Sequence, residues 1–294
     1  MGWFSDFLKQ LLEQILGSNG GGNPPDQPDP PETPDTPDTP DQPGTSPSLG
    51  IQRASFLFDN AGTRAMNALS YNASEDWTTE VMNRQKKNGD DTVWLYFSNQ
   101  GDGSPKPTTI YQGLFGGALD PTRVAMVRKR LKNYRDNGFK VVAWLTADDS
   151  STISNASLTV HKQFIDDVHK NFGDLISGYC VGLEMNEDKN RKAMAPSLIA
   201  HCKAVTKKNT GVHLLTGSWQ EAVQWKADTL YYQAGFGKSA SQVKAECASV
   251  VGKLKGACGF VLAEYHKSSD SNEAKAIGQA AMTVTGCLGT GNGR

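Results

Sequence analysis

The feature that most constrains the fold of this chain is an alternation of short apolar runs and helical patterns that starts at Ile51. A short apolar run between turn residues is typical of a buried strand, and a longer segment with apolar residues every three or four positions is typical of a helix. The expected strands are residues 54–58, 92–97, 140–145, 176–183, 212–215, 229–232 and 259–263, with a weaker one at 285–288. The expected helices are residues 77–87, 121–136, 158–171, 196–207, 241–254 and 272–283.

The turns between these segments support the same order. Asn88-Gly89 and Asn137-Gly138 end two helices just before a strand, and Asp120-Pro121 supplies a cap and a first-turn proline for another helix. Strands that alternate with helices form a parallel sheet, and eight of them in residues 51–294 match the size of a closed barrel. The prediction is an α/β fold, a (β/α)8 TIM barrel. An open doubly wound sheet would need a glycine-rich phosphate loop after its first strand, and residues 60–64 do not form one.

Residues 1–17 are expected to form an amphipathic helix. Apolar pairs recur every four residues from Trp3-Phe4 to Ile15-Leu16, which places one wide apolar face on a helix. Such a helix must cover this face, so we expect residues 3–16 to mediate self-association or attachment to a larger protein assembly. Packing back on the barrel stays open as an alternative, and a membrane surface is disfavoured because the polar face is not basic.

Residues 18–50 are expected to be a disordered linker. Ten of the 14 prolines lie between Pro24 and Pro47, among repeated Asp and Thr and almost no apolar residue. Proline-rich chain is extended and acts as a semi-rigid spacer. The three segments therefore predict a barrel tethered by its N-terminal helix to a particle or a cell surface, with the cellular location otherwise unknown.

Charge and composition exclude several classes of function. The net charge is −1 and no basic run is present, so no nucleic-acid partner is expected. We expect no membrane span and no standard secretory signal. The histidines, including His161 and His169 on the surface of a predicted helix, form no metal-binding pattern, and neither a metal nor a cofactor is expected. The five cysteines allow two readings: buried thiols throughout, or one disulfide such as Cys258–Cys287.

Two predicted strands end in acidic residues. In a barrel, functional side chains lie at the carboxyl ends of strands. The fourth run delivers Glu184, Asn186 and Glu187, and the seventh ends in Glu264 directly after apolar residues. An acid that continues a buried strand is costly unless it is paired or functional. Glycoside hydrolysis requires two carboxyl groups that flank one sugar bond, so these glutamates are the candidate catalytic residues.

This arrangement resembles the clan-A retaining glycoside hydrolases, in which an Asn-Glu pair ends strand 4 and a glutamate ends strand 7. The resemblance implies that Glu264 is the nucleophile, that Glu187 is the acid/base, and that Asn186 binds the sugar 2-hydroxyl group. It extends to Tyr231 and Tyr232 at strand 6, one of which would orient the nucleophile, and to Asn292 near the end of the chain. It implies a carbohydrate substrate, a polysaccharide or glycan.

Several choices stay open. Glu184 competes with Glu187, because Glu184 shares side-chain parity with Asn186 and Glu187 faces inward only if the strand end bulges. Further candidates for sugar binding are Trp219, Tyr265, His266 and Asp59. The alternative function is a catalytically silent barrel used for binding or display on a phage or other particle.

Overall fold

The computed structural model describes residues 48–54, 69, 73–97, 110–113, 115–146, 151–266 and 272–291. The predicted helix at 1–17 and almost all of the predicted linker at 18–50 lie outside these residues. The strands are β1 Gln52–Arg53, β2 Thr92–Tyr96, β3 Lys140–Trp144, β4 Gly178–Cys180, β5 Asn209–Leu214, β6 Thr229–Gln233, β7 Gly259–Glu264 and β8 Cys287–Thr290. The helices are α2 Glu75–Asn88, α3 Pro121–Asp136, α4 Ser151–Ser154, α5 Leu158–Phe172, α6 Lys189–Thr206, α7 Trp219–Gln224, α8 Ala240–Leu254 and α9 Asn272–Met282.

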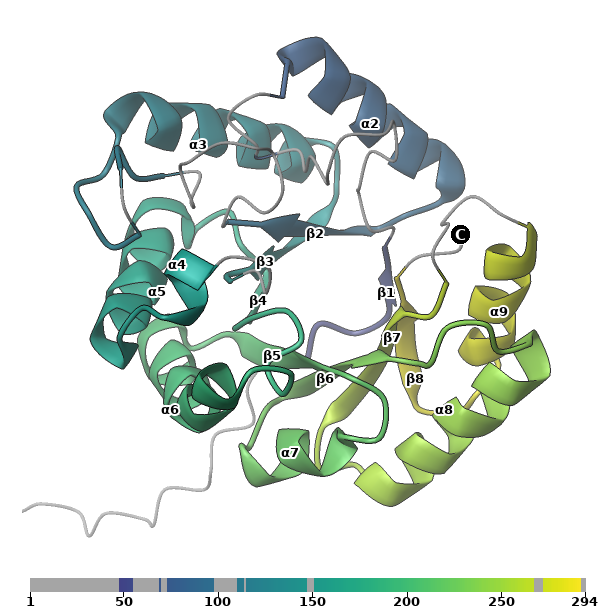
Figure 1. The fold of residues 1–294 in the computed structure, drawn as a ribbon. Helices are drawn as coiled ribbons and strands as arrows, with labels where there is room; N and C mark the ends of the chain where they lie inside the picture. The colour runs from purple at the N-terminus through teal and green to yellow at the C-terminus, as the bar shows by residue number, and fades with distance from the viewer. Residues whose placement is uncertain are drawn as a thin grey trace, which may run out of the picture. The chain divides into compact units, whose positions relative to one another are not determined.

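The eight strands form one parallel sheet that curls into a nearly closed barrel with the helices around it (Figure 1). The strand order is β1-β8-β7-β6-β5-β4-β3-β2, so β1 and β2 end the series. Asp91, just before β2, bridges them: its Oδ1 accepts a hydrogen bond from the Arg53 N–H at 2.9 Å, and its own N–H donates to the Arg53 carbonyl at 2.9 Å. The predicted (β/α)8 barrel is confirmed.

Local sequence explains where most helices begin. Ser74, Asp120, Ser157, Asp188 and Ser239 each cap a helix by accepting hydrogen bonds from first-turn N–H groups. The expected start at Pro196 was wrong, because Asp188 caps α6 earlier and Pro196 lies inside that helix. The short helices α4 and α7 were not predicted, since four and six residues carry too little periodicity.

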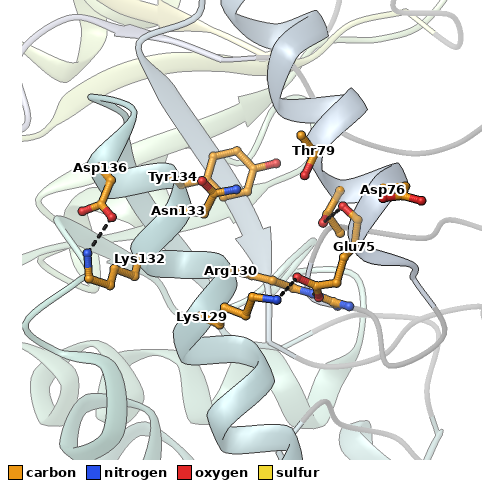
Figure 2. Close-up of a pocket in the computed structure, with 10 residues that line it drawn as sticks. Glu75, Asp76, Thr79, Lys129, Arg130, Lys132, Asn133, Tyr134 and Asp136 are labelled. Carbon is orange, nitrogen blue, oxygen red and sulfur yellow. Dashed lines mark hydrogen bonds and ion pairs between the residues drawn. The ribbon is translucent and has the colours of Figure 1, made fainter.

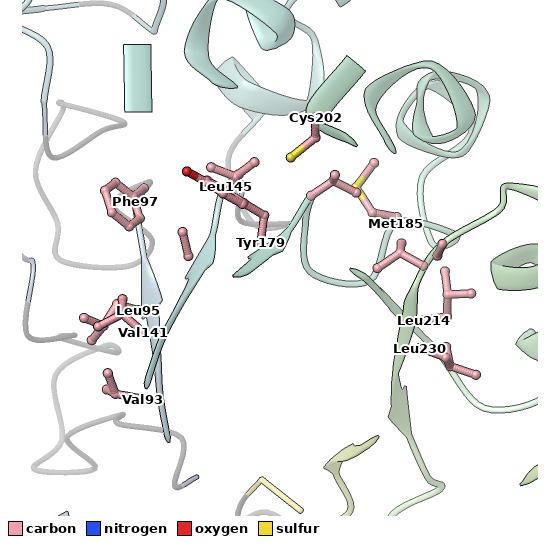
Figure 3. Packing of buried hydrophobic residues seen from close by; sticks show 14 of the residues in the cluster. Val93, Leu95, Phe97, Val141, Leu145, Tyr179, Met185, Cys202, Leu214 and Leu230 are labelled. Atoms are coloured by element: carbon pink, nitrogen blue, oxygen red, sulfur yellow. The ribbon is translucent and has the colours of Figure 1, made fainter. Parts of the chain in front are cut away.

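The apolar core has two layers. Outward-facing strand residues share one buried cluster with helix residues. Figure 3 shows five of these strand residues, with side chains on the outer side of the strands: Val93, Leu95, Val141, Tyr179 and Leu230. Inward-facing residues fill the barrel itself with a second cluster, which consists of Ala54, Trp94, Tyr96, Val142, Trp144, Cys180, Leu183, Tyr231, Val261 and Ala263. Alternate residues of one strand therefore belong to different clusters, which gives the direction of each side chain.

Two side-chain predictions are settled by burial. All five cysteines are free thiols, so Cys258–Cys287 is not a disulfide; four of the thiols are buried as predicted, and Cys258 is half-buried. The surface position expected for His161 was wrong, because that side chain is 2 % exposed. Its Nε2 lies 3.0 Å from the Ile153 carbonyl oxygen, and burial lowers its pKa to about 4. A histidine on an amphipathic helix can thus belong to the buried face when the neighbouring backbone offers a hydrogen bond.

Candidate active site

The amino end of the barrel is closed by the residues that lead into β1. The Leu49 side chain packs against the inner cluster, and Lys140 Nζ donates to the carbonyl oxygens of Leu49 (3.1 Å) and Ile51 (2.9 Å). A substrate therefore has to approach from the other end, where the strands finish. We call this carboxyl end of the barrel the mouth.

Aromatic rings fill the barrel below the mouth. Trp94, Trp144 and Tyr231 pack with centroids 5.2 to 5.5 Å apart. Gln52 Oε1 accepts hydrogen bonds from Trp94 Nε1 (3.3 Å) and from the Tyr231 hydroxyl (3.2 Å). Tyr231 is completely buried, and this burial raises the pKa of its phenol. Tyr231, predicted to contact substrate, is thus part of the packed interior and offers no ring face to a bound sugar.

Glu264 is the last residue of β7 and follows a β-bulge. Simple alternation would place Ala263 and Tyr265 on the same side, yet Ala263 belongs to the inner cluster and Tyr265 to the outer one. The pairing with β6 explains this difference, because β7 advances from Leu262 to Glu264 while β6 advances by one residue. In such a bulge two successive side chains lie on the same side of the sheet. Glu264 therefore follows Ala263 onto the inner side at the mouth.

Gln233 is the neighbour of Glu264 on β6. The two residues are paired in register, and the Ala234 N–H donates to the Glu264 carbonyl at 2.8 Å. Gln233 shares the inward parity of Tyr231, and its Oε1 is buried without a hydrogen-bond partner among the described residues. The sequence analysis did not include Gln233, because it assigned substrate binding at this strand to Tyr231 and Tyr232. Gln233 could have been identified as a polar residue two positions after Tyr231, because alternate residues of a strand face the same side.

The end of β4 differs from the sequence prediction. The strand covers only Gly178–Cys180 rather than residues 176–183. Glu184 has φ 45°, a left-handed conformation that is rare outside glycine, and the Glu187 N–H donates to the Glu184 carbonyl at 3.0 Å. Both acids therefore lie on a turn, where strand parity no longer decides which one faces the substrate. Glu187 is exposed and Glu184 is half-buried.

His213 of β5 holds this turn in place. Its Nδ1 accepts a hydrogen bond from the Glu184 N–H at 3.0 Å, and its carbonyl accepts from the Met185 N–H at 3.0 Å. The imidazole lies inside the barrel, 5.2 Å from the Trp144 ring. Burial, and secondarily the charge of Arg191, lower the pKa of His213 to about 3. The ring is therefore neutral near pH 7, with its proton on Nε2, and that atom has no hydrogen-bond partner in the part of the chain that the structure describes.

Asn186 and Arg191 complete the support of the turn. Asn186 Oδ1 accepts from the Leu215 N–H at 3.0 Å, and its Nδ2 donates to Ser218 Oγ at 2.8 Å. The buried Arg191 guanidinium donates to the Leu183 carbonyl. Asn186 thus ties the turn after β4 to the segment after β5. Its predicted contact with a sugar hydroxyl would have to coexist with these bonds.

The remaining predicted residues are more dispersed. The Tyr232 hydroxyl lies on the outer side of the sheet, where it accepts from the Gly217 N–H (3.0 Å) and donates to Glu246 Oε1 (2.8 Å). Trp219 begins α7 and packs on the outer core, where Tyr265 is completely buried. His266 Nε2 lies 3.5 Å from Glu273 Oε2. Asp59 and Asn292 lie outside the described residues.

A surface hollow of about 450 Å³ lies elsewhere, between α2 and α3 (Figure 2). Glu75 at its edge forms ion pairs with Lys129 (2.8 Å) and Arg130 (3.0 Å). Its walls are helix side chains on the flank of the barrel, so this hollow does not include the glutamates at the strand ends. Among the residues that the structure describes, no group of three or more His, Cys, Asp or Glu side chains could hold a metal ion. Within the same residues, no helix has the length and apolarity needed to cross a membrane.

Comparison with known proteins shows similarity in structure alone. No protein-family model and no curated protein matches the sequence. The fold is similar to a GH113 β-1,4-mannanase, with a TM-score of 0.57 and 12 % identity over 82 % of this chain and 87 % of that one. It is similar to a GH5_18 structure from Bifidobacterium longum subsp. infantis, with a TM-score of 0.59 and 12 % identity over 83 % of this chain and 69 % of that one. The predicted likeness to clan-A glycoside hydrolases is therefore confirmed at the level of the fold.

Proposed function

We propose that the barrel is a retaining glycoside hydrolase in which Glu264 is the nucleophile and Glu187 is the acid/base. The observation that carries this proposal is the β7 bulge, which turns Glu264 toward the inner side of the mouth. The strand order supports a pair, because β4 and β7 lie three strands apart in an eight-stranded ring and so face each other across it. A retaining enzyme needs its two carboxyl groups roughly 5 Å apart.

The reaction would proceed in two steps. The Glu264 carboxylate attacks the anomeric carbon, and the bond to the leaving oxygen breaks while Glu187 gives that oxygen a proton. The ionised Glu187 then removes a proton from water. The resulting hydroxide attacks the anomeric carbon, which releases the sugar and restores the Glu264 carboxylate.

Glu187 suits the acid/base role better than Glu184. Its side chain is exposed, and no ion pair with a lysine or arginine involves it in the part of the chain that the structure describes. Glu184 has its backbone held by His213 in a left-handed conformation, which shapes the turn that presents Glu187. Glu184 remains the second candidate, since its carboxyl lies on the same turn.

The fold neighbours support a proposal for the substrate class. They include β-1,4-mannanases and an exo-β-1,4-mannosidase, so we propose a β-linked polysaccharide or glycan and would test β-1,4-mannan first. The full chain should release reducing ends from β-1,4-mannan, cellulose or xylan, and proton NMR of the first products should show retained anomeric configuration. A folded chain that cleaves none of the three contradicts the proposal, and an inverted product contradicts the retaining mechanism.

We further propose that residues 1–17 and 18–50 tether the barrel to a larger assembly or to other copies of the chain. The apolar pairs of residues 3–16 support this, because a helix of that pattern has to cover its apolar face. Replacing Phe7 and Leu11 with Asp should lower the molar mass in light scattering to that of a monomer, if the partner is another copy. An unchanged mass would restrict the role to attachment to a different protein.

A further inference from the structure

Phe236 is an exposed aromatic residue three positions after Gln233, which pairs with the candidate nucleophile Glu264. Among the described residues, the large apolar side chains that are exposed are Ile51, Val223 and Phe236, and Phe236 is 43 % exposed. Ile51 precedes β1 at the closed end of the barrel, and Val223 lies in α7. Phe236 lies between β6 and α8, in a loop that starts at the mouth.

This loop is fixed at both of its ends. At its start, the Ala234 N–H donates to the Glu264 carbonyl at 2.8 Å. After the turn, Lys238 Nζ forms an ion pair with Glu246 Oε2 at 2.7 Å, and Glu246 Oε1 accepts from the Tyr232 hydroxyl at 2.8 Å. Phe236 therefore occupies the tip of a short anchored loop that begins at the backbone of Glu264. A loop held in this way loses little conformational freedom on binding a ligand.

Gln233 adds a polar group at the same place. It precedes the loop, is paired with Glu264, and carries a buried Oε1 that accepts no hydrogen bond from any described residue. A buried acceptor without a partner costs free energy, which a ligand hydroxyl at this position would recover. The end of β6 thus offers an apolar ring and an amide acceptor within a few residues of each other.

We propose that Gln233 and Phe236 form a sugar-binding subsite next to Glu264. A pyranose ring has an apolar face of C–H groups and a rim of hydroxyls. The Phe236 ring would stack on the apolar face, and Gln233 Oε1 would accept a hydrogen bond from a hydroxyl. This inference rests on the proposed glycosidase function, which it deepens by naming two residues that select and hold the sugar.

Kinetics of the full chain test the role of Phe236. The polysaccharide is whichever of mannan, cellulose and xylan the chain cleaves. The probe is the pentasaccharide with the same sugar and linkage. Phe236→Ala should raise KM about tenfold, the loss of one ring-stacking contact, with kcat within about twofold of wild type. Phe236→Tyr should restore the wild-type KM, because it keeps the ring. The matched control is Val223→Ala, which truncates an apolar side chain that is 36 % exposed and should change neither constant.

Binding without turnover tests Gln233. In a Glu264→Gln background, calorimetry with the same pentasaccharide should show about tenfold weaker binding for Gln233→Leu, which keeps the size of the side chain and removes its acceptor. If wild type cleaves a substrate but both Phe236→Ala and Gln233→Leu behave as their parents do, the subsite is wrong and the glycosidase stands. If wild type neither cleaves nor binds any of the three sugars, the proposed function fails and the subsite fails with it.

Discussion

The ends of β4 and β7 present candidate catalytic acids in two different ways. β7 is six residues long, pairs with a strand on each side, and remains in the sheet up to Glu264. β4 is three residues long, and Glu184 and Glu187 follow on a turn outside the sheet. The direction of Glu264 therefore depends on strand register and one bulge, whereas the placement of the β4 acids depends on individual side chains of β5 and α6.

This difference suits the two chemical roles. A nucleophile must hold one fixed direction toward the anomeric carbon, and a carboxylate at the end of a doubly paired strand is well held. An acid/base must reach the leaving oxygen and afterwards a water molecule, so an exposed position on a turn is suitable. We expect the β7 end to be sensitive to loss of its own carboxylate, and the β4 end to be sensitive to changes in its neighbours.

The largest expected effect is the loss of the Glu264 carboxylate. Glu264→Gln should lower kcat on the best polysaccharide roughly 10³-fold or more, because an amide cannot form the glycosyl–enzyme bond. The variant should keep the wild-type thermal midpoint within a few degrees. Glu80→Gln, an exposed glutamate on α2, is the matched control and should retain full activity. An active Glu264→Gln enzyme would falsify the assignment of the nucleophile.

The next effect separates the two acids of the β4 turn. Glu187→Gln should lower kcat on polysaccharide roughly 10²-fold, since general acid catalysis contributes about that much. The loss should be much smaller on an aryl glycoside with a good leaving group, which needs little protonation. Glu184→Gln should affect both substrates equally if it acts through the turn. The reverse pattern would make Glu184 the acid/base and Glu187 a neighbour.

The two strand ends were also unequally predictable from sequence. The run of residues 259–264 is apolar until its final glutamate, so local pattern alone identified Glu264. The run of residues 176–183 looks equally strand-like, but β4 ends at Cys180. Glu184 then adopts φ 45°, and its N–H donates to His213, 29 positions later. Bonds between residues so far apart leave no local pattern.

The residues of β6 that face the mouth were also predicted only in part, because their position depends on pairing between strands. Tyr231 and Tyr232 looked suitable as residues near the end of the sixth run, yet both are buried, one inside the barrel and one beneath the helices. The polar residue at the strand end is Gln233, and its position opposite Glu264 depends on the bulge in β7. A bulge depends on pairing between two strands, which alternation within one strand cannot predict.

A smaller effect is expected from removal of the His213 acceptor. His213→Leu would leave the Glu184 N–H without its hydrogen bond, which we expect to lower the free energy of unfolding by about 1–3 kcal/mol. It should also lower kcat, because the turn that presents Glu187 loses its support. His213→Asn is the matched variant, since its Oδ1 can accept the same hydrogen bond. The measurements are urea unfolding and kcat for both variants. Equal losses of stability and kcat in His213→Leu and His213→Asn would show that packing of the imidazole, and not its hydrogen-bond acceptor, supports the turn.

The smallest effect is a change in how stability depends on pH. The pKa of His213 is lowered to about 3 in the folded chain from an ordinary value of 6.5. Between these values the unfolded state binds a proton that the folded state does not, so the free energy of unfolding falls as pH falls below about 6.5. One such group contributes a slope of about 1.4 kcal/mol per pH unit. The stability should be fully present above pH 6.5 and decline toward pH 4.

His213→Asn removes this contribution and keeps the hydrogen bond to Glu184. Urea unfolding at pH 7.5, 6.5, 5.5 and 4.5 should therefore show a flatter decline for this variant than for wild type, with the difference close to one proton. His161, whose pKa is lowered to about 4, contributes a similar slope in both proteins and cancels in the comparison. Parallel curves for the two proteins would mean that His213 is protonated in the folded state. In that case its Nδ1 could not accept the Glu184 N–H, and the β4 turn would be held by Asn186 and Arg191 instead.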